Sequence, residues 1–128
     1  MTEVVMVGRC ALILTVALAM TGCGVSQASL DDAQKLVQSS LEVWAKGGKP
    51  ADLRGQARPV EIVEQLWSNG EALMSFEMGK TSYSSRDRMI RCEAKLTLRG
   101  RKGKPYVENV AYDVSLGPPV KIVNNPMP

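Results

Sequence analysis

The feature that most constrains the fold of this chain is a strictly alternating segment, residues 89–98. Its apolar or small positions are Ile90, Cys92, Ala94, Leu96 and Leu98, and the positions between them are Arg91, Glu93, Lys95 and Thr97. Successive side chains of a strand point to opposite faces of its sheet. The alternation therefore predicts a strand with one face on a hydrophobic core and the other in water.

Neighbouring segments predict the strands that pair with this one. Residues 72–78 and 107–116 alternate in the same way, and residues 120–123 form a last short apolar segment. The inward side chains are expected to be Ala72, Met74, Phe76 and Met78 in the first segment and Val110, Tyr112, Val114 and Leu116 in the second. Residues 99–105 predict a hairpin connection, and residues 124–128 are expected to form a frayed end.

One long helix is predicted to cover the apolar face of this sheet. Ser29 and Asp32 have the spacing of a capping box at its start, and Gly47 and Gly48 end it. Residues 50–53 predict one further helical turn, with proline at its first position. The buried face of the long helix is predicted to consist of Ala33, Leu36, Val37, Ser40, Leu41 and Trp44.

Residues 57–67 allow two interpretations. The positions with helical spacing are Val60, Val63, Leu66 and Trp67. Residues 59–63 also alternate, which is typical of a short strand, so helix and strand both stay open. Asn69 and Gly70 indicate a turn in either case.

These segments together predict an α+β domain over residues 29–123, with one N-terminal helix packed on a curved antiparallel sheet of three to four strands. This order resembles the cystatin-like and NTF2-like group, in which a curved sheet wraps a long helix. The segments Trp44-Ala-Lys-Gly-Gly-Lys-Pro and Trp67-Ser-Asn-Gly, with paired strands ending in Gly-Pro-Pro, are similar to uncharacterised envelope proteins of planctomycete-type bacteria. The resemblance spans residues 30–123 and implies a fold without a catalytic motif.

The N-terminus has the pattern of an export signal. Arg9 precedes an apolar run from Cys10 to Met20 that only Thr15 interrupts. The run has 11 residues, whereas a helix that crosses a bilayer needs about 20. This length is typical of a signal peptide. The run ends in Met20-Thr21-Gly22-Cys23, which resembles the bacterial lipobox.

The lipobox resemblance implies that residues 1–22 are a signal peptide and that Cys23 carries a diacylglyceryl thioether and an acylated amino group. Two or three acyl chains anchor a protein stably to a membrane. Residues 23–28 would then be the lipidated cysteine and a short tether. Gly24 follows the cysteine at a place where Asp often causes inner-membrane retention, so the resemblance favours the periplasmic side of the outer membrane.

Three other interpretations of the N-terminus stay open. Ala17-Leu18-Ala19 is an A-x-A site, and cleavage after it would release a protein without an anchor. An uncleaved anchor helix would place Arg9 near the middle of the bilayer, which is costly. Translation from Met6 would remove Glu3 from the leader.

The composition limits the chemistry of the domain. Removing the leader would leave 106 residues with a net charge of +3, a mild balance that requires no polyanionic partner. The chain has no histidine, the commonest general base and metal ligand, and we expect no metal or other cofactor. Cys92 lacks a neighbouring base and lies on an apolar face, so we predict a buried structural thiol rather than a nucleophile.

Two groups of charged residues are candidate sites. The cations of the 99–105 hairpin are Arg99, Arg101, Lys102 and Lys104. They could contact anionic headgroups or envelope polymers, or they could keep the hairpin soluble and protect strand edges. The carboxylates of the domain are scattered and are expected to form a solvated face; they are Glu61, Glu64, Glu71, Glu77, Asp87, Glu93, Glu108 and Asp113.

These observations predict a lipid-anchored envelope protein that acts as a non-catalytic binding module, with no nucleic-acid partner. Trp44 and Trp67 could line a pocket between helix and sheet, although core packing is their default role. One alternative is a passive structural protein. Another is an enzyme in a helix–sheet cavity, which requires two of these carboxylates to converge: Glu61, Glu77, Glu93, Glu108 and Asp113.

Overall fold

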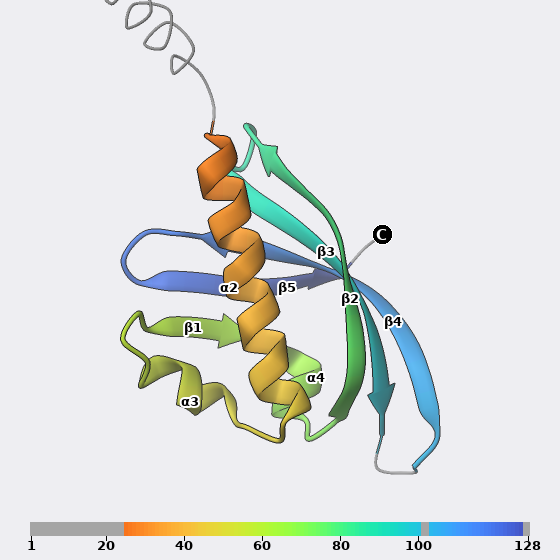
Figure 1. The fold of residues 1–128 in the computed structure, drawn as a ribbon. Coiled ribbons are helices and arrows are strands. Elements are labelled where there is room, and N and C mark those ends of the chain that lie inside the picture. Colours follow the sequence, from red (N-terminus) through yellow and green to blue (C-terminus); the bar gives the residue numbers. More distant parts are fainter. Residues whose placement is uncertain (1–24, 101–102, 127–128) are drawn as a thin grey trace, which may run out of the picture.

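The computed structural model describes residues 25–100 and 103–126, which form one long helix, two short helices and a five-stranded sheet (Figure 1). In chain order the elements are α2 (Gln27–Ala45), α3 (Pro50–Arg54), β1 (Val60–Val63), α4 (Gln65–Ser68), β2 (Ala72–Ser84), β3 (Met89–Arg99), β4 (Pro105–Ser115) and β5 (Val120–Pro126). The predicted α+β class is confirmed. The signal peptide and Cys23 lie outside the described residues.

Helix α2 begins earlier than the sequence predicts. Ser26 is its N-cap, and the Ser26 hydroxyl accepts a hydrogen bond from the backbone N–H of Ser29 at 3.2 Å. The predicted start at Ser29 is therefore wrong, because a second capping residue stands three positions upstream and Gln27 and Ala28 continue the helix. Two residues of the expected tether thus belong to α2.

The buried face of α2 follows the predicted stripe. Its buried residues are Ala33, Val37, Ser40, Leu41 and Trp44. Leu36 is half-buried against the same core. The helix ends before Gly47, whose φ of 88° is a left-handed conformation that glycine adopts without strain. Helix α3 supplies the predicted turn after Pro50.

The sheet has the strand order β1-β5-β4-β3-β2, and it is mixed rather than purely antiparallel. Strand β1 pairs in parallel with β5, with Val60 opposite Val120, and the other neighbours are antiparallel. Four strands, β2 to β5, pair antiparallel as predicted, and β1 adds a parallel edge strand that the prediction did not include. The ambiguous segment 57–67 provides both that strand and the single turn of α4.

Strand β2 contains a bulge that changes which side chains face inward. Its register against β3 shifts between Leu73 and Ser75, so Met74 is an extra residue. Leu73 is consequently buried, while Ala72 and Met74 are exposed. The prediction that Ala72 and Met74 point inward is wrong. Because Met74 is inserted in the strand, the residues before it face the opposite way from the predicted alternation. Phe76 and Met78 are half-buried on the inner face, as predicted.

Strands β3 and β4 bury the side chains that the sequence predicts. In β3 these are Ile90, Cys92, Ala94, Leu96 and Leu98, and in β4 they are Val110, Tyr112 and Val114. Strand β5 extends past the predicted boundary, because Asn124 and Asn125 pair with β4. The expected frayed end is wrong for these residues, and residues 127–128 lie outside the described part.

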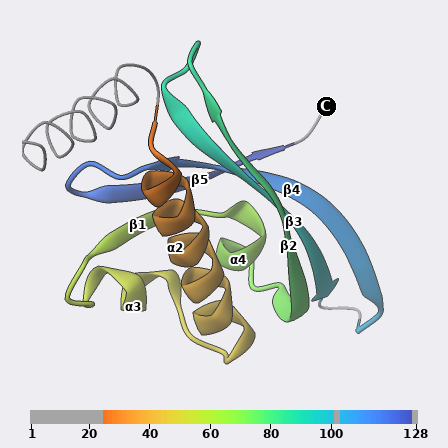
Figure 2. The same cartoon turned by 45° about the horizontal axis from the view of Figure 1, so that its top comes forward.

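The helices all lie on one side of the sheet, and the core fills the space between (Figures 1 and 2). The start of α2, at Ser26, lies at the same end of the molecule as the β2–β3 turn, residues 85–88, which we call the N-terminal end. The last turn of α2 lies at the opposite end, the end at which β3 ends and β4 begins.

Candidate functional site

Two tryptophans join the last turn of α2 to α4. The rings of Trp44 and Trp67 are stacked, with centroids 5.3 Å apart and planes 11° from parallel. The indole N–H of Trp44 donates to the carbonyl of Glu71 at 2.9 Å, and that of Trp67 donates to the carbonyl of Gly48 at 3.0 Å. Both side chains are buried, so the predicted core role is confirmed. Trp44 therefore binds α2 to the loop after α4, and Trp67 binds α4 to the loop after α2.

An open pocket of about 740 Å³ lies beside this pair. Its wall includes both tryptophans, the cations Lys49 and Arg54, and Glu71. Lys49 precedes α3 and Arg54 ends it, so this short helix places two exposed cations next to an aromatic wall. We call the end of the molecule that holds this pocket the pocket end.

Glu71 lines the pocket and also lies close to Gly100 in the hairpin of residues 99–105. Its half-buried carboxyl group accepts a hydrogen bond from the hydroxyl of Tyr106 in β4, and this bond raises the pKa of Tyr106 to about 12. A Cβ atom at Gly100 would lie 3.1 Å from the Oε1 atom of Glu71. The residue after β3 therefore runs directly past this carboxyl group, and glycine permits the approach.

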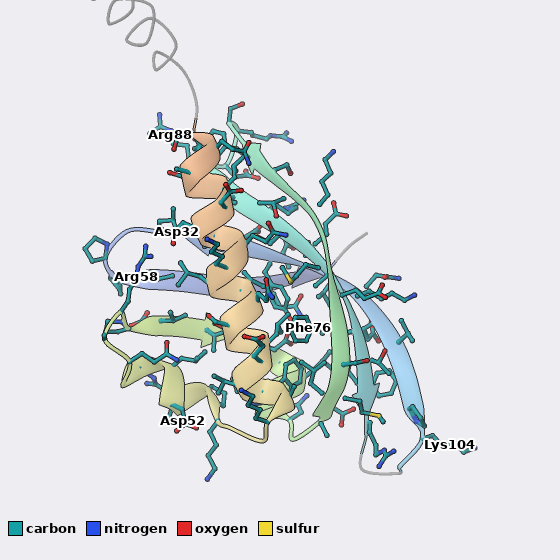
Figure 3. All side chains as sticks on the ribbon, in the orientation of Figure 1. Asp32, Asp52, Arg58, Phe76, Arg88 and Lys104 are labelled. Carbon is teal, nitrogen blue, oxygen red and sulfur yellow. The ribbon has the colours of Figure 1, made fainter. Side chains whose placement is uncertain are left out.

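The structure describes two of the four cations of the 99–105 hairpin. Arg99 is the exposed last residue of β3 and pairs with Ala72, which lines the pocket. Lys104 is exposed just before β4 (Figure 3). Arg101 and Lys102 lie outside the described residues. The two described cations thus belong to the pocket end, although sequence reasoning did not connect the hairpin with Lys49 and Arg54.

The carboxylates that the enzyme hypothesis requires do not line the pocket beside α2. Glu77 and Glu93 share a shallow pocket of about 210 Å³ with Lys95 and Asn109, on the face of the sheet opposite the helices. The carboxylate of Asp113 accepts a hydrogen bond from Arg91 at 3.1 Å. Arg91 and Asp113 are direct partners in the pairing of β3 with β4, and such a cross-strand pair stabilises a sheet modestly.

Sequence reasoning missed a buried carboxyl group, that of Glu64. This residue is 1% exposed, and the expectation that it lies on a solvated face is wrong. It accepts hydrogen bonds from the Tyr112 hydroxyl at 2.5 Å, from the Asn124 amide at 2.9 and 3.0 Å, and from the Leu66 backbone N–H at 3.0 Å. Glu64 is also the N-cap of α4, and its place two residues before Leu66 was the available signal.

The Glu64 cluster joins β1 and α4 to β4 and β5 inside the core. Tyr112 is fully buried, and burial together with the nearby Glu64 carboxyl group raises the pKa of Tyr112. Neither side chain lines the two pockets described above. The cluster therefore satisfies buried polar groups and holds four elements together rather than facing a substrate.

Cys92 lies fully buried on the inner face of β3, as predicted. Burial raises the pKa of its thiol, and the hydroxyl of Thr81 opposes that rise. Because the thiolate is the reactive form, this environment makes the thiol a poor nucleophile. Within residues 25–100 and 103–126, no group of three or more Cys, Asp and Glu side chains lies close enough to hold a metal ion.

Comparison with protein-family models, with curated proteins and with solved structures finds no match for the chain. None of the helices in the described part of the chain has the length and apolar character that crossing a membrane requires. The geometry of the pocket end is therefore the basis for a functional proposal.

Proposed function

We propose that this protein is a lipid-anchored binding module of the bacterial cell envelope, and that its pocket end binds an anionic partner. The observation that carries the proposal is the open pocket of about 740 Å³ in which Lys49 and Arg54 stand beside the Trp44–Trp67 pair. A concave site with an apolar wall and a few charged groups is the usual form of a ligand site.

The anchor is supported by the N-terminal sequence. The short apolar run and the lipobox-like end at Cys23 favour acylation, and we propose the periplasmic side of the outer membrane as the location. The helix lying in the bend of the sheet supports kinship with the cystatin-like and NTF2-like group (Figure 1). This kinship is a proposal about ancestry and adds no chemistry to the site.

The charge at the pocket end supports an anionic ligand. The exposed cations there are Lys49, Arg54, Arg99 and Lys104. None of these four cations forms an ion pair with another described residue. The cations are therefore available to carboxylate, sulfate or phosphate groups of a polymer in the envelope.

Two alternatives have less support. A carboxylate-dependent enzyme would need two of its five candidate carboxylates in a cavity between helix and sheet, whereas Glu77 and Glu93 share only a shallow pocket on the opposite face of the sheet. A passive structural protein would not need an open site with two exposed cations.

Salt-dependent binding to heparin, a soluble polyanion, tests the binding proposal. The full chain would be purified from membranes in a neutral detergent, and the emission of Trp44 and Trp67 would report occupation of the pocket. The test variant is Lys49→Glu with Arg54→Glu. Each cation contributes about 1 kcal/mol near an anionic surface, so reversing two predicts a loss of affinity of about tenfold or more.

The matched control is Lys35→Glu with Lys80→Glu, which changes the net charge equally at two exposed positions outside the pocket lining. This control is expected to keep the affinity of the wild type. If both double variants lose affinity equally, the binding follows overall charge and the pocket is not the site. Wild-type affinity in the Lys49 and Arg54 variant would contradict the proposal outright.

A further inference from the structure

The N-terminal end of the domain leaves almost no free chain before the proposed lipid. Val25 is half-buried and packs against the hydrophobic core, and Ser26 caps α2. Val25 is only two residues after Cys23, and an extended chain spans at most about 3.6 Å per residue, or roughly 7 Å here. An acylated Cys23 would therefore hold this end of the domain at the membrane surface.

The β2–β3 turn, residues 85–88, lies at the same end. Figure 1 shows this turn at the same end as the first turn of α2, and Figure 3, in the same orientation, labels Arg88 beside the start of the helix. Figure 2 shows the turn standing away from the helix at that end. Arg86 and Arg88 are exposed, and neither forms an ion pair within the described residues. Asp87 lies between them and receives a hydrogen bond from Ser84 at 3.4 Å. The two guanidinium groups are thus available to a partner.

Arg88 has a backbone conformation that suits glycine better. Its φ is 55°, in the left-handed region that a residue with a side chain rarely adopts. Three half-buried apolar side chains also leave part of their surface open near this end: Val25, Leu30 and Tyr83. Cationic side chains at the same end as partly open apolar ones fit a lipid headgroup region, where arginine pairs with phosphate and tyrosine is favoured.

We infer that the domain stands end-on on the membrane that holds Cys23, with Arg86 and Arg88 binding the phosphate groups of lipids in that leaflet. This inference rests on the proposed acylation of Cys23. Helix α2 has 19 residues and is about 28 Å long at 1.5 Å per residue. The pocket and the cations Arg99 and Lys104 consequently face away from the anchoring bilayer, so their partner is not that membrane.

Headgroup-attached nitroxide lipids test this orientation. The full acylated chain is reconstituted in vesicles of phosphatidylethanolamine and phosphatidylglycerol, with a thiol-reactive fluorophore on Ser85→Cys or on the matched position Lys104→Cys. Cys92 is buried and Cys23 would be blocked by lipid, so one site is labelled in each variant, and intact mass verifies this. We expect the fluorophore at 85 to be quenched and the fluorophore at 104 to retain its emission.

A second pair of variants tests the arginines. Arg86→Gln with Arg88→Gly removes both guanidinium groups and relieves the positive φ, so the fold is retained. Quenching at 85 is expected to fall in phosphatidylglycerol vesicles. The control, Arg99→Gln with Lys104→Gln, is expected to leave it unchanged.

Different failures have different meanings. An acylated chain that shows equal quenching at both positions, or stronger quenching at 104, would overturn the inference while leaving the anchor intact. A chain whose mass includes no acyl groups would overturn the anchor, and the inference with it. Quenching at 85 that survives loss of both arginines would overturn the phosphate contact.

Discussion

Glu64 shows how a single residue can hold this fold together without a countercharge. Its partners within the described chain are neutral: the Tyr112 hydroxyl, the Asn124 amide and the Leu66 backbone N–H. A buried carboxyl group is tolerated only when hydrogen bonds replace the water it has lost. Those partners come from α4, β4 and β5. Because Glu64 directly follows β1, the cluster holds the edge strand β1 in place relative to β4 and β5.

Replacing Glu64 with Ala is predicted to destabilise the protein strongly. The Tyr112 hydroxyl and the Asn124 amide would remain buried without an acceptor, and each unsatisfied group costs about 1–3 kcal/mol. We expect the free energy of unfolding to fall by roughly 3 kcal/mol, measured by urea denaturation. Glu64→Gln retains one acceptor oxygen and is expected to lose less. A loss below about 0.5 kcal/mol for the Ala variant, the range of an ordinary surface change, would contradict this role.

The tyrosines predict loss of stability at high pH. Folding raises the pKa of Tyr106 from 10.0 to about 12 and also raises that of Tyr112. Below pH 10 both are neutral in the folded and unfolded states, so their contribution is fully present. As the pH rises from 10 toward 12 the unfolded chain releases protons first, and the free energy of unfolding falls.

Denaturation in urea at several pH values between 9 and 12 measures this loss, and absorbance at 295 nm follows ionisation. Tyr106→Phe removes one of the two groups and should flatten the pH dependence. A free energy of unfolding that is constant or rises across this window would contradict the assignment.

Some residue roles were predictable from the sequence, and others were not. The burial of Trp44 and Cys92 followed from helical and strand periodicity, which local sequence encodes. The role of Glu64 depends on Tyr112 and Asn124, which are far away in the chain. Nothing in the spacing of the carboxylates separates this buried one from its exposed neighbours.

At the scale of elements, the long helix and the central strand were predictable because their periodicity is local. The parallel pairing of β1 with β5 was not, since it joins Val60 to Val120, which are far apart in the sequence. The bulge at Met74 was also hidden, because a run of alternating apolar residues gives no sign of an inserted position. Local patterns therefore predicted the kind of element, whereas edge pairing and register depended on distant partners.

The start of α2 gives a test at this scale. Ser26 accepts a hydrogen bond from the backbone N–H of Ser29, so Ser26→Ala should remove the cap and cost about 1 kcal/mol of unfolding free energy. Ser29→Ala is the matched comparison, because it keeps the cap from Ser26 and removes only the contact between the two hydroxyl groups at 3.1 Å, so we expect a smaller loss. Urea denaturation of both variants measures the difference. A larger loss in Ser29→Ala would contradict the observed cap and support the start at Ser29.

At the scale of the whole molecule, the structure separates two ends. The N-terminal end holds the start of α2 and the turn at residues 85–88, and the pocket end holds Trp44, Trp67 and Arg99 (Figures 1 and 2). An anchor at one end and an open cationic site at the other suit a protein that presents its ligand site away from a membrane. The anchor is the step on which the account of function depends.

Intact mass and membrane fractionation of the wild type and of Cys23→Ala, expressed in a bacterial host, test that step most directly. If Cys23 is acylated, we expect the wild type in membranes with the mass of residues 23–128 plus acyl chains. We also expect that the Cys23→Ala variant keeps its signal peptide. A product outside the membranes that begins at Met20 would show cleavage after Ala19, and it would contradict the lipid anchor.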